Sequence, residues 1–366
     1  MGLNFGIVGL PNVGKSTLFN ALTRSAAAEV ANYPFCTIEP NVGTTFVRDN
    51  RLKTLASMAN SQKVIFSSIE FVDIAGLVKG ASSGEGLGNK FLGHIREVDA
   101  IMHVLRCFED GDISHVNQTV DPVHDAEIVE MELMLADMES VKRQIITTEK
   151  AVKSRKETQS KLDTLIKVLE TLEGGKPVRS LHKNEDIDQG ILKQLHLLSG
   201  KPVMYVCNVE DINASTGNKL SASVQEMASK HDACHCTLSA KLEADILALD
   251  TEEERSAFLE EVGLKESGID IAVRTIYKLL NLITFFTIGP NEARAWPILT
   301  NTPAYKAAGV IHTDFEKGFI KAETISFADY INYSGESGCK EAGKVRFEGK
   351  DYIVQDGDII HFRVNR

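Results

Sequence analysis

The chain has 366 residues, 43% of them hydrophobic, and a formal net charge of -11. This length predicts two or three domains with a sizeable buried core. The acidic balance argues against nucleic-acid binding over the whole surface, but it leaves a local basic patch open. No apolar run approaches the ~20 residues of a membrane helix, and the six scattered cysteines are typical of free thiols in a reducing compartment. We therefore expect a cytoplasmic protein that does not enter a membrane.

An N-terminal apolar run leads into the segment GLPNVGKST at residues 9–17. Gly9 and Gly14 let the backbone turn tightly enough for several N–H groups to point at one phosphate. The helix that starts here adds its positive dipole end. Lys15 is expected to reach the β- and γ-phosphates as a catalytic charge, and the Ser16 hydroxyl to ligate Mg²⁺. Nucleotide binding is predicted for Asn12, Val13, Gly14, Lys15, Ser16 and Thr17.

A second apolar run, at residues 64–72, predicts a strand that ends in the motif DIAG. An Asp at this place, Asp73, can hold Mg²⁺ through water, and the Gly76 N–H can sense the γ-phosphate. Thr37 lies in the proline-punctuated stretch between the first helix and this strand, where it can give Mg²⁺ a second hydroxyl. The predicted metal ligands are Ser16, Thr37 and Asp73, and together with the phosphate loop they indicate a nucleotide-hydrolysing switch.

Apolar runs of strand length alternate with helical segments up to residue 107. This alternation predicts an α/β fold with a mostly parallel sheet. The pattern returns at residues 202–207 and 235–238, and a short polar motif follows each run, NVED and SAK respectively. Both motifs stand where nucleotide-switch proteins read the base. We expect base contacts from Asn208, Val209, Asp211, Ser239 and Ala240.

Between these two parts, residues 126–172 contain neither proline nor glycine. Apolar residues recur there with 3-4-3 spacing, which predicts two helices packed as a hairpin along a heptad seam. The seam residues are Ile128, Met131, Leu135 and Met138 on the first helix, and Leu162, Leu165, Leu169 and Leu172 on the second.

The predicted hairpin is basic. From Lys142 to Lys183 there are eleven Lys and Arg residues against five Asp and Glu residues. Lys150, Lys153, Arg155 and Lys156 lie between the two seams. Such an arm can contact nucleic acid, but the outer face of a coiled coil is charged in any case. The sequence leaves both interpretations open.

Five segments of the chain resemble the signatures of the Obg-like ATPase family, known in bacteria as YchF. They are residues 9–16, 32–41, 73–80, 84–89 and 312–319. The resemblance covers essentially the whole chain. It implies a P-loop NTPase G domain over residues 1–280, with a helical coiled-coil hairpin inserted at about 124–185, followed by a ubiquitin-like (β-grasp) TGS domain over residues 281–366. It also implies ATP preferred over GTP, association with the ribosome through the large subunit, and RNA contacts through the basic hairpin and the TGS domain.

The base preference can also be argued from the residues. Guanine-specific switches use Asn-Lys-x-Asp, in which the Lys stem stacks on the base and the Asp accepts two guanine hydrogens. Here Val209 replaces the Lys, as expected for an Obg-like ATPase, but Asp211 stands where the family usually has Glu. A carboxylate at this position can in principle still accept from guanine. ATP is therefore the expected ligand, and weaker GTP binding stays open.

Many switch GTPases orient the attacking water with a Gln directly after Asp-x-x-Gly, but here that residue is Leu77. Another group must act on the water, and His115 is the candidate because it resembles the loop histidine of the family. Asn12 resembles the Asn that binds K⁺ in some related switches, which makes K⁺ a second candidate cofactor beside Mg²⁺. Two alternative functions remain: a GTPase in ribosome assembly, and an RNA- or ribosome-binding module with incidental hydrolysis.

Overall fold

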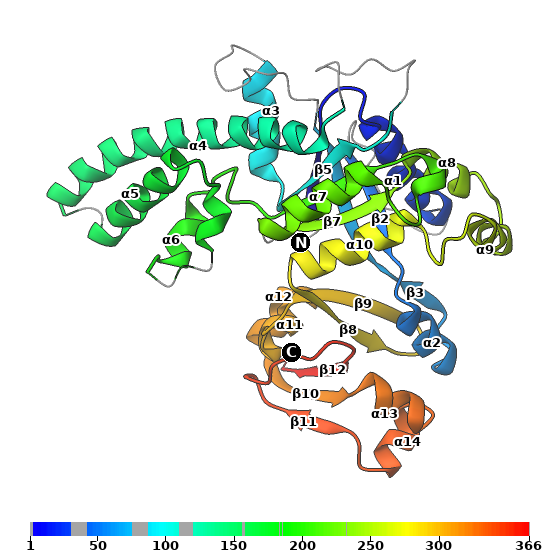
Figure 1. Cartoon of the computed structure of the whole chain (residues 1–366). Coiled ribbons are helices and arrows are strands. Elements are labelled where there is room, and N and C mark those ends of the chain that lie inside the picture. The colour runs from blue at the N-terminus through cyan, green and yellow to red at the C-terminus, as the bar shows by residue number, and fades with distance from the viewer. Residues whose placement is uncertain are drawn as a thin grey trace. The chain divides into compact units, whose positions relative to one another are not determined.

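The computed structural model describes residues 3–30, 42–74, 87–109, 120–155, 158–182, 184, 186–231 and 233–365. These residues form two compact units (Figure 1). The larger unit consists of Leu3–Thr45 and Glu70–Thr275, and the smaller unit of Phe46–Ile69 and Ile276–Arg366. In the described part of the chain, no helix has both the length and the apolar character that crossing a bilayer requires.

The described residues of the larger unit build a six-stranded sheet. In spatial order its strands are β2 (Val42–Val47), β4 (Ser67–Asp73), β1 (Leu3–Val8), β5 (Ala100–Arg106), β6 (Val203–Asn208) and β7 (Cys234–Leu238). Strands β1, β5, β6 and β7 pair in parallel. Every residue of β5 and β6 is buried, as in strands that are covered on both faces. The predicted α/β fold with a mostly parallel sheet is confirmed.

Helices connect these strands. They are α1 (Lys15–Val30), α3 (Leu87–Glu97), α4 (Pro122–Lys153), α5 (Gln159–Glu173), α6 (Gln189–Gln194), α7 (Lys219–Lys230), α8 (Ala240–Leu247), α9 (Glu252–Glu261) and α10 (Gly268–Leu279), with 3₁₀ turns at Val178–Leu181 and Asp211–Asn213. Because β1, β5, β6 and β7 are parallel, the loops after their carboxyl ends meet at one edge of the sheet. This edge carries the site described below.

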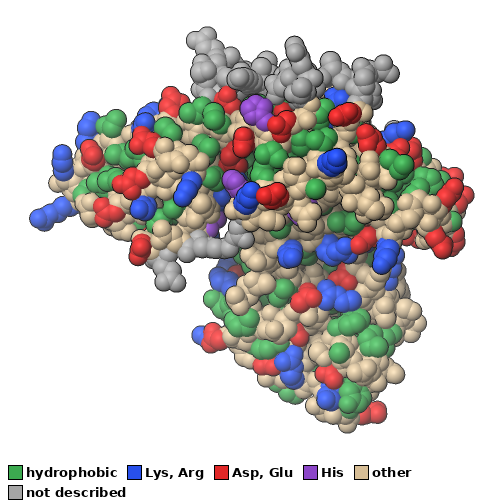
Figure 2. All heavy atoms as spheres, in the orientation of Figure 1, with side chains coloured by type: hydrophobic (Ala, Val, Ile, Leu, Met, Phe, Trp, Pro, Cys, Tyr) green, Lys and Arg blue, Asp and Glu red, His purple; other side chains and the backbone are tan. Residues whose placement is uncertain are grey.

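Helices α4 and α5 form the predicted hairpin, and Leu165 on α5 is fully buried as expected. The predicted seam on α4 is wrong at Met131 and Leu135, which are 57% and 44% exposed, whereas Met138 packs against the core that contains Leu165. The buried face of α4 instead contains Val129, Leu133, Ala136 and Val141. The reason is that α4 also packs on β5 and α7, which selects a different apolar stripe. Figure 2 shows Lys and Arg side chains on the hairpin among acidic and apolar ones.

The smaller unit has its own six-stranded sheet within the described residues. In spatial order the strands are β11 (Arg346–Glu348), β10 (Phe319–Ile325), β12 (Ile359–Val364), β8 (Leu282–Ile288), β9 (Glu292–Leu299) and β3 (Lys63–Ile65). Its helices are α2 (Asn50–Met58), α11 (Ala304–Ile311), α12 (Thr313–Lys317), α13 (Phe327–Asn332) and α14 (Glu336–Glu341). Neighbouring residues of β8 point to opposite faces: Phe285 shares a core with α11, and Phe286 shares one with α2 and α13.

The apolar run at residues 64–72, predicted as one strand, forms two strands in two different sheets. Strand β3 pairs with β9, and β4 joins the sheet of the larger unit. The break falls at Phe66, whose side chain packs with Val64 against the core beneath α2. The smaller unit thus contains residues 46–69 in addition to the C-terminal part of the chain. The domain limit predicted at residues 280 and 281 stays a prediction.

Candidate nucleotide site

The segment between β1 and α1 is a tight loop. Gly14 has φ +91°, and a Cβ there would lie 2.2 Å from the Nδ2 atom of Asn208. A Cβ on Gly9 would lie 2.7 Å from the carbonyl oxygen of Val104 on β5. Neighbouring atoms leave no room for a side chain at either position. At Gly14 the positive φ also disfavours any residue other than glycine. The Leu18 N–H donates to the Gly14 carbonyl at 3.0 Å and starts the ladder of α1, so the N–H groups before it have no acceptor within the helix.

Lys15 joins this loop to the end of β4. Its ammonium group contacts the carboxylate of Asp73 and donates to the carbonyl of Ile74 at 2.8 Å. The two charged side chains are largely shielded, at 13% and 20% exposed. Ser16 follows directly in the first turn of α1 and is exposed. A carboxylate and a lysine ammonium thus contact each other beside the start of a helix, and the hydroxyl-bearing Ser16 follows the lysine in the chain. This oxygen donor set fits a hard divalent cation, and the lysine and helix terminus fit phosphate.

Asn208 links three segments of the site. Its Nδ2 donates to the Val13 carbonyl and its Oδ1 accepts from the Ala240 N–H, both at 2.9 Å. The residue is only 5% exposed. Its amide therefore holds the phosphate loop, the end of β6 and the start of α8 in fixed positions. The backbone of Val209 is engaged as well, since its N–H donates to the Leu238 carbonyl at 2.9 Å.

The carboxylate of Asp211 lies against the segment after β7. Its Oδ1 accepts from the Ser239 hydroxyl at 2.5 Å, and its Oδ2 lies 3.3 Å from the Lys241 ammonium nitrogen. The Ser239 oxygen in turn accepts from the Leu242 N–H at 3.2 Å and caps α8. Both carboxylate oxygens thus have partners in the protein, and the arrangement holds Asp211 beside the first turn of α8.

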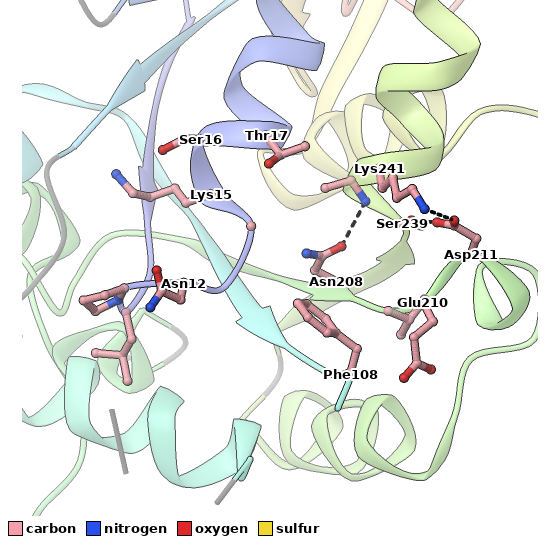
Figure 3. Close-up of a pocket in the computed structure, with 15 residues that line it drawn as sticks. Asn12, Lys15, Ser16, Thr17, Phe108, Asn208, Glu210, Asp211, Ser239 and Lys241 are labelled. Carbon is pink, nitrogen blue, oxygen red and sulfur yellow. Dashed lines mark hydrogen bonds and ion pairs between the residues drawn. The ribbon is translucent and has the colours of Figure 1, made fainter. Parts of the chain in front are cut away.

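These segments line one cavity of about 930 Å³. In Figure 3, Lys15 and Ser16 lie at one end of the labelled residues, Asp211 and Lys241 at the other, and Asn208 between them. The lining consists of Leu10, Pro11, Asn12, Gly14, Lys15, Ser16, Thr17, Phe108, Asn208, Val209, Glu210, Asp211, Ser239, Ala240 and Lys241. Residues distant in the sequence but predicted to share a site are therefore brought together. Val13 takes part through its carbonyl group, and Asp73 through Lys15.

The structure adds Phe108, Glu210 and Lys241 to the expected set. Phe108 lies two residues after the end of β5 and is half-buried, and the guanidinium of Arg106 lies 4.8 Å from the centre of its ring. The only sequence signal for this residue is its place after a parallel strand, at the edge where the other site loops meet. Thr37, Gly76, Leu77 and His115 lie outside the described residues.

Comparison with known protein families gives two matches. A model described as "50S ribosome-binding GTPase" matches residues 4–135. A second model, YchF-GTPase_C, carries the description "Protein of unknown function (DUF933)" and matches residues 282–365. The two matches lie in different parts of the chain.

Individual relatives match over the full length. The chain is 51% identical to "Ribosome-binding ATPase YchF" of Bacillus subtilis (strain 168) over 368 residues, which cover 100% of both chains. It is 50% identical to the protein of the same name from Escherichia coli O157:H7, again over 100% of both chains. The solved structure of the Schizosaccharomyces pombe YchF GTPase superposes with a TM-score of 0.86 at 36% identity, covering 99% of this chain and 98% of that one.

Proposed function

The chain belongs to the YchF family, and we propose that it is a P-loop ATPase that binds and hydrolyses ATP and associates with the ribosome. One observation carries the proposal: the phosphate loop and both segments expected to read the base line the same cavity. The full-length relatives named as ribosome-binding ATPases give the reaction and the partner.

The phosphate end of the cavity supports catalysis by charge. Lys15 is proposed to donate to the β- and γ-phosphates, together with the N–H groups at the start of α1. Ser16 and Asp73 are proposed to hold Mg²⁺, with Thr37 as a further ligand and the Gly76 N–H on the γ-phosphate. When bound, Mg²⁺ would neutralise phosphate charge in the transition state. A K⁺ ion at Asn12 is a further proposal, which rests on the sequence resemblance.

The water that attacks the phosphate needs an orienting group, because Leu77 cannot form a hydrogen bond through its side chain. We propose His115 for this role, on the basis of the sequence resemblance. Lys15 and the metal ligands would stabilise charge during the reaction but would not activate water. Turnover is therefore expected to be slow unless His115 or a partner orients the water.

The base end of the cavity favours adenine. Guanine needs a carboxylate that accepts two hydrogens and a donor for its O6 atom. Here Asp211 is already paired with Ser239 and Lys241, and the Ala240 N–H already donates to Asn208. Phe108 offers a half-buried ring for contact with either purine. We therefore propose that ATP binds more tightly than GTP. The carboxylate at position 211 favours GTP as a second substrate.

Ribosome association would use RNA contacts from the hairpin and the smaller unit. Lys150, Lys153 and Arg155 are exposed at and just after the end of α4, where a projecting arm can reach phosphates. We further propose that the partner is the large ribosomal subunit, that residues 281–366 act as a TGS domain, and that the protein works in the cytoplasm.

Calorimetric titration with non-hydrolysable ATP and GTP analogues in the presence of Mg²⁺ tests the nucleotide assignment. We expect the ATP analogue to bind at least tenfold more tightly, and Lys15→Ala to weaken binding of both analogues. Tighter binding of the GTP analogue would mean that the protein is a GTPase and not an ATPase. Failure of both analogues to bind the wild-type protein would refute the proposed site.

A further inference from the structure

The segment Phe46–Ile69 occupies an unusual place in the fold. It connects β2 to β4, which are neighbours in the sheet of the larger unit, yet it belongs to the smaller unit. Strand β4 itself runs across the limit between the units at residues 69 and 70, and it ends at Asp73 beside Lys15. No loop separates the segment from the strand that carries this predicted metal ligand.

Apolar contacts fix the segment in the smaller unit. Leu52 and Leu55 of α2 are 0% exposed and share a core with Phe286 of β8 and Ile359 of β12. Strand β3 adds an edge strand to the sheet, in parallel register with β9 from Lys63 opposite Glu292 to Ile65 opposite Arg294. These contacts pack α2 against the C-terminal sheet and make β3 its edge strand.

Polar contacts hold the same segment. The Arg51 guanidinium donates to the Asp356 carboxylate at 2.7 Å and 3.3 Å and also binds Asp49, the N-cap of α2. Asp356 in turn accepts from the Thr284 N–H of β8 at 2.9 Å. The Ser61 hydroxyl donates to the carbonyl of Gly289 at 2.7 Å. The start of α2 and the entry to β3 are thus bonded to C-terminal residues.

We propose that Phe46–Ile69 couples the nucleotide site to the smaller unit, so that ligand binding at one changes the stability of the other. The inference rests on the proposed nucleotide site and adds its regulation. Three residues of continuous strand lie between Ile69 and Asp73, so their Cα atoms are about 13 Å apart. Because the strand is hydrogen-bonded and extended, it has no slack to absorb a shift of Asp73. Coupling between two binding equilibria is reciprocal, so a partner of the smaller unit changes nucleotide affinity by the same factor.

Amide hydrogen exchange of the full-length protein, with and without a non-hydrolysable ATP analogue, tests the coupling. In the wild type the analogue is expected to slow exchange of β8 and β9 at least threefold, although neither strand contributes to the cavity. Arg51→Ala removes the polar anchor and is expected to reduce this protection by at least half. Asp356→Asn, which keeps an oxygen for the Thr284 N–H, is expected to act in the same direction with a milder effect on folding.

Arg363→Ala is the matched control. It also removes a two-pronged contact of an arginine with a carboxylate in the smaller unit, that with Glu323 at 3.0 Å and 3.1 Å, but it leaves Phe46–Ile69 untouched. This variant is expected to respond to nucleotide as the wild type does. Two results would overturn the coupling but leave the proposed function standing. One is nucleotide binding without any change in the amide exchange of β8 and β9. The other is equal nucleotide protection of these strands in Arg51→Ala and Arg363→Ala. Absence of nucleotide binding by the wild type would overturn the proposed function together with it.

Discussion

At the scale of single residues, the amide of Asn208 is the most connected group of the candidate site. We expect Asn208→Ala to lower the free energy of unfolding by about 2–4 kcal/mol, because the Val13 carbonyl and the Ala240 N–H lose their buried partner. ATP affinity should fall at least tenfold, since the phosphate loop and the start of α8 are no longer joined. Urea denaturation and calorimetric titration measure the two effects.

The control for this variant is Asn213→Ala, which removes an exposed hydrogen bond to Glu210 on the same side of the site. This substitution should lower the free energy of unfolding by less than about 0.5 kcal/mol, as is usual for exposed contacts. Wild-type stability and affinity in Asn208→Ala would show that the amide is not a structural link.

The sequence placed Asn208 in the site but could not reveal this link. Its two partners lie 195 and 32 residues away in the chain, and a motif does not say which atoms a side chain uses. Phe108 escaped prediction for a related reason. A single aromatic residue after a strand has no spacing pattern, so only the folded sheet edge shows that it lines the cavity.

A second residue-scale prediction concerns His103 on β5, which is 3% exposed. Burial, with a smaller effect of the nearby Arg179 charge, lowers the pKa of His103 to about 3. The unfolded chain keeps a pKa near 6.5, so below pH 6.5 it binds a proton that the native state does not. The contribution of His103 to stability is therefore complete above pH 6.5 and is lost as the pH falls. The loss amounts to about 2 kcal/mol between pH 6.5 and pH 5.

Urea denaturation at several pH values measures this loss. His103→Phe removes the titrating group and should flatten the fall in unfolding free energy between pH 6.5 and pH 5. His124→Gln, at a position whose side chain is 57% exposed, should keep the wild-type slope. Identical slopes in all three proteins would mean that His103 does not stay neutral in the native state.

At the scale of elements, the hairpin shows what apolar spacing can and cannot decide. Helix α4 carries two apolar stripes, one through Leu133 and one through Met131 and Leu135. Heptad spacing correctly indicated a pair of helices, but two of the seam residues that it selected on α4, Met131 and Leu135, remain exposed. The choice depends on β5 and α7, which pack against α4 and are not encoded in the local pattern. Helix α5 also packs on the turn Val178–Leu181 and on α6, yet its predicted seam residue Leu165 is buried.

The two stripes predict different costs for the same substitution. Leu165→Ala should lower the free energy of unfolding by about 2–5 kcal/mol, because the side chain is fully buried and its removal leaves a cavity. Leu135→Ala should cost less than about 1 kcal/mol, since the side chain is 44% exposed. Both changes convert Leu to Ala within a helix, so helix propensity is matched. Equal losses in urea denaturation would contradict the observed packing of α4.

At the scale of the whole molecule, the two units are not continuous segments of the sequence. Residues 46–69 lie more than 200 positions before the strands with which they pack. The apolar run at residues 64–72 shows no break in its sequence pattern. Burial sets the composition of both of its strands, although β3 and β4 belong to different sheets. Sequence resemblance gave the family, whereas the assignment of residues 46–69 to the smaller unit requires coordinates.

The last prediction concerns the charge of the whole chain and its use on the ribosome. An acidic protein with a formal net charge of -11 is repelled by RNA overall, so association needs a local basic surface. We expect replacement of Lys150, Lys153 and Arg155 by Gln to reduce co-sedimentation with ribosomes. The dependence of binding on salt should also become weaker, by up to about three released counterions.

The control replaces Lys219, Lys230 and Lys265, which are exposed in the same unit, and changes the net charge equally. Loss of binding only in the hairpin variant supports a contact between this arm and RNA. Equal co-sedimentation of both variants would mean that the hairpin charges do not contact RNA and form an ordinary solvated surface.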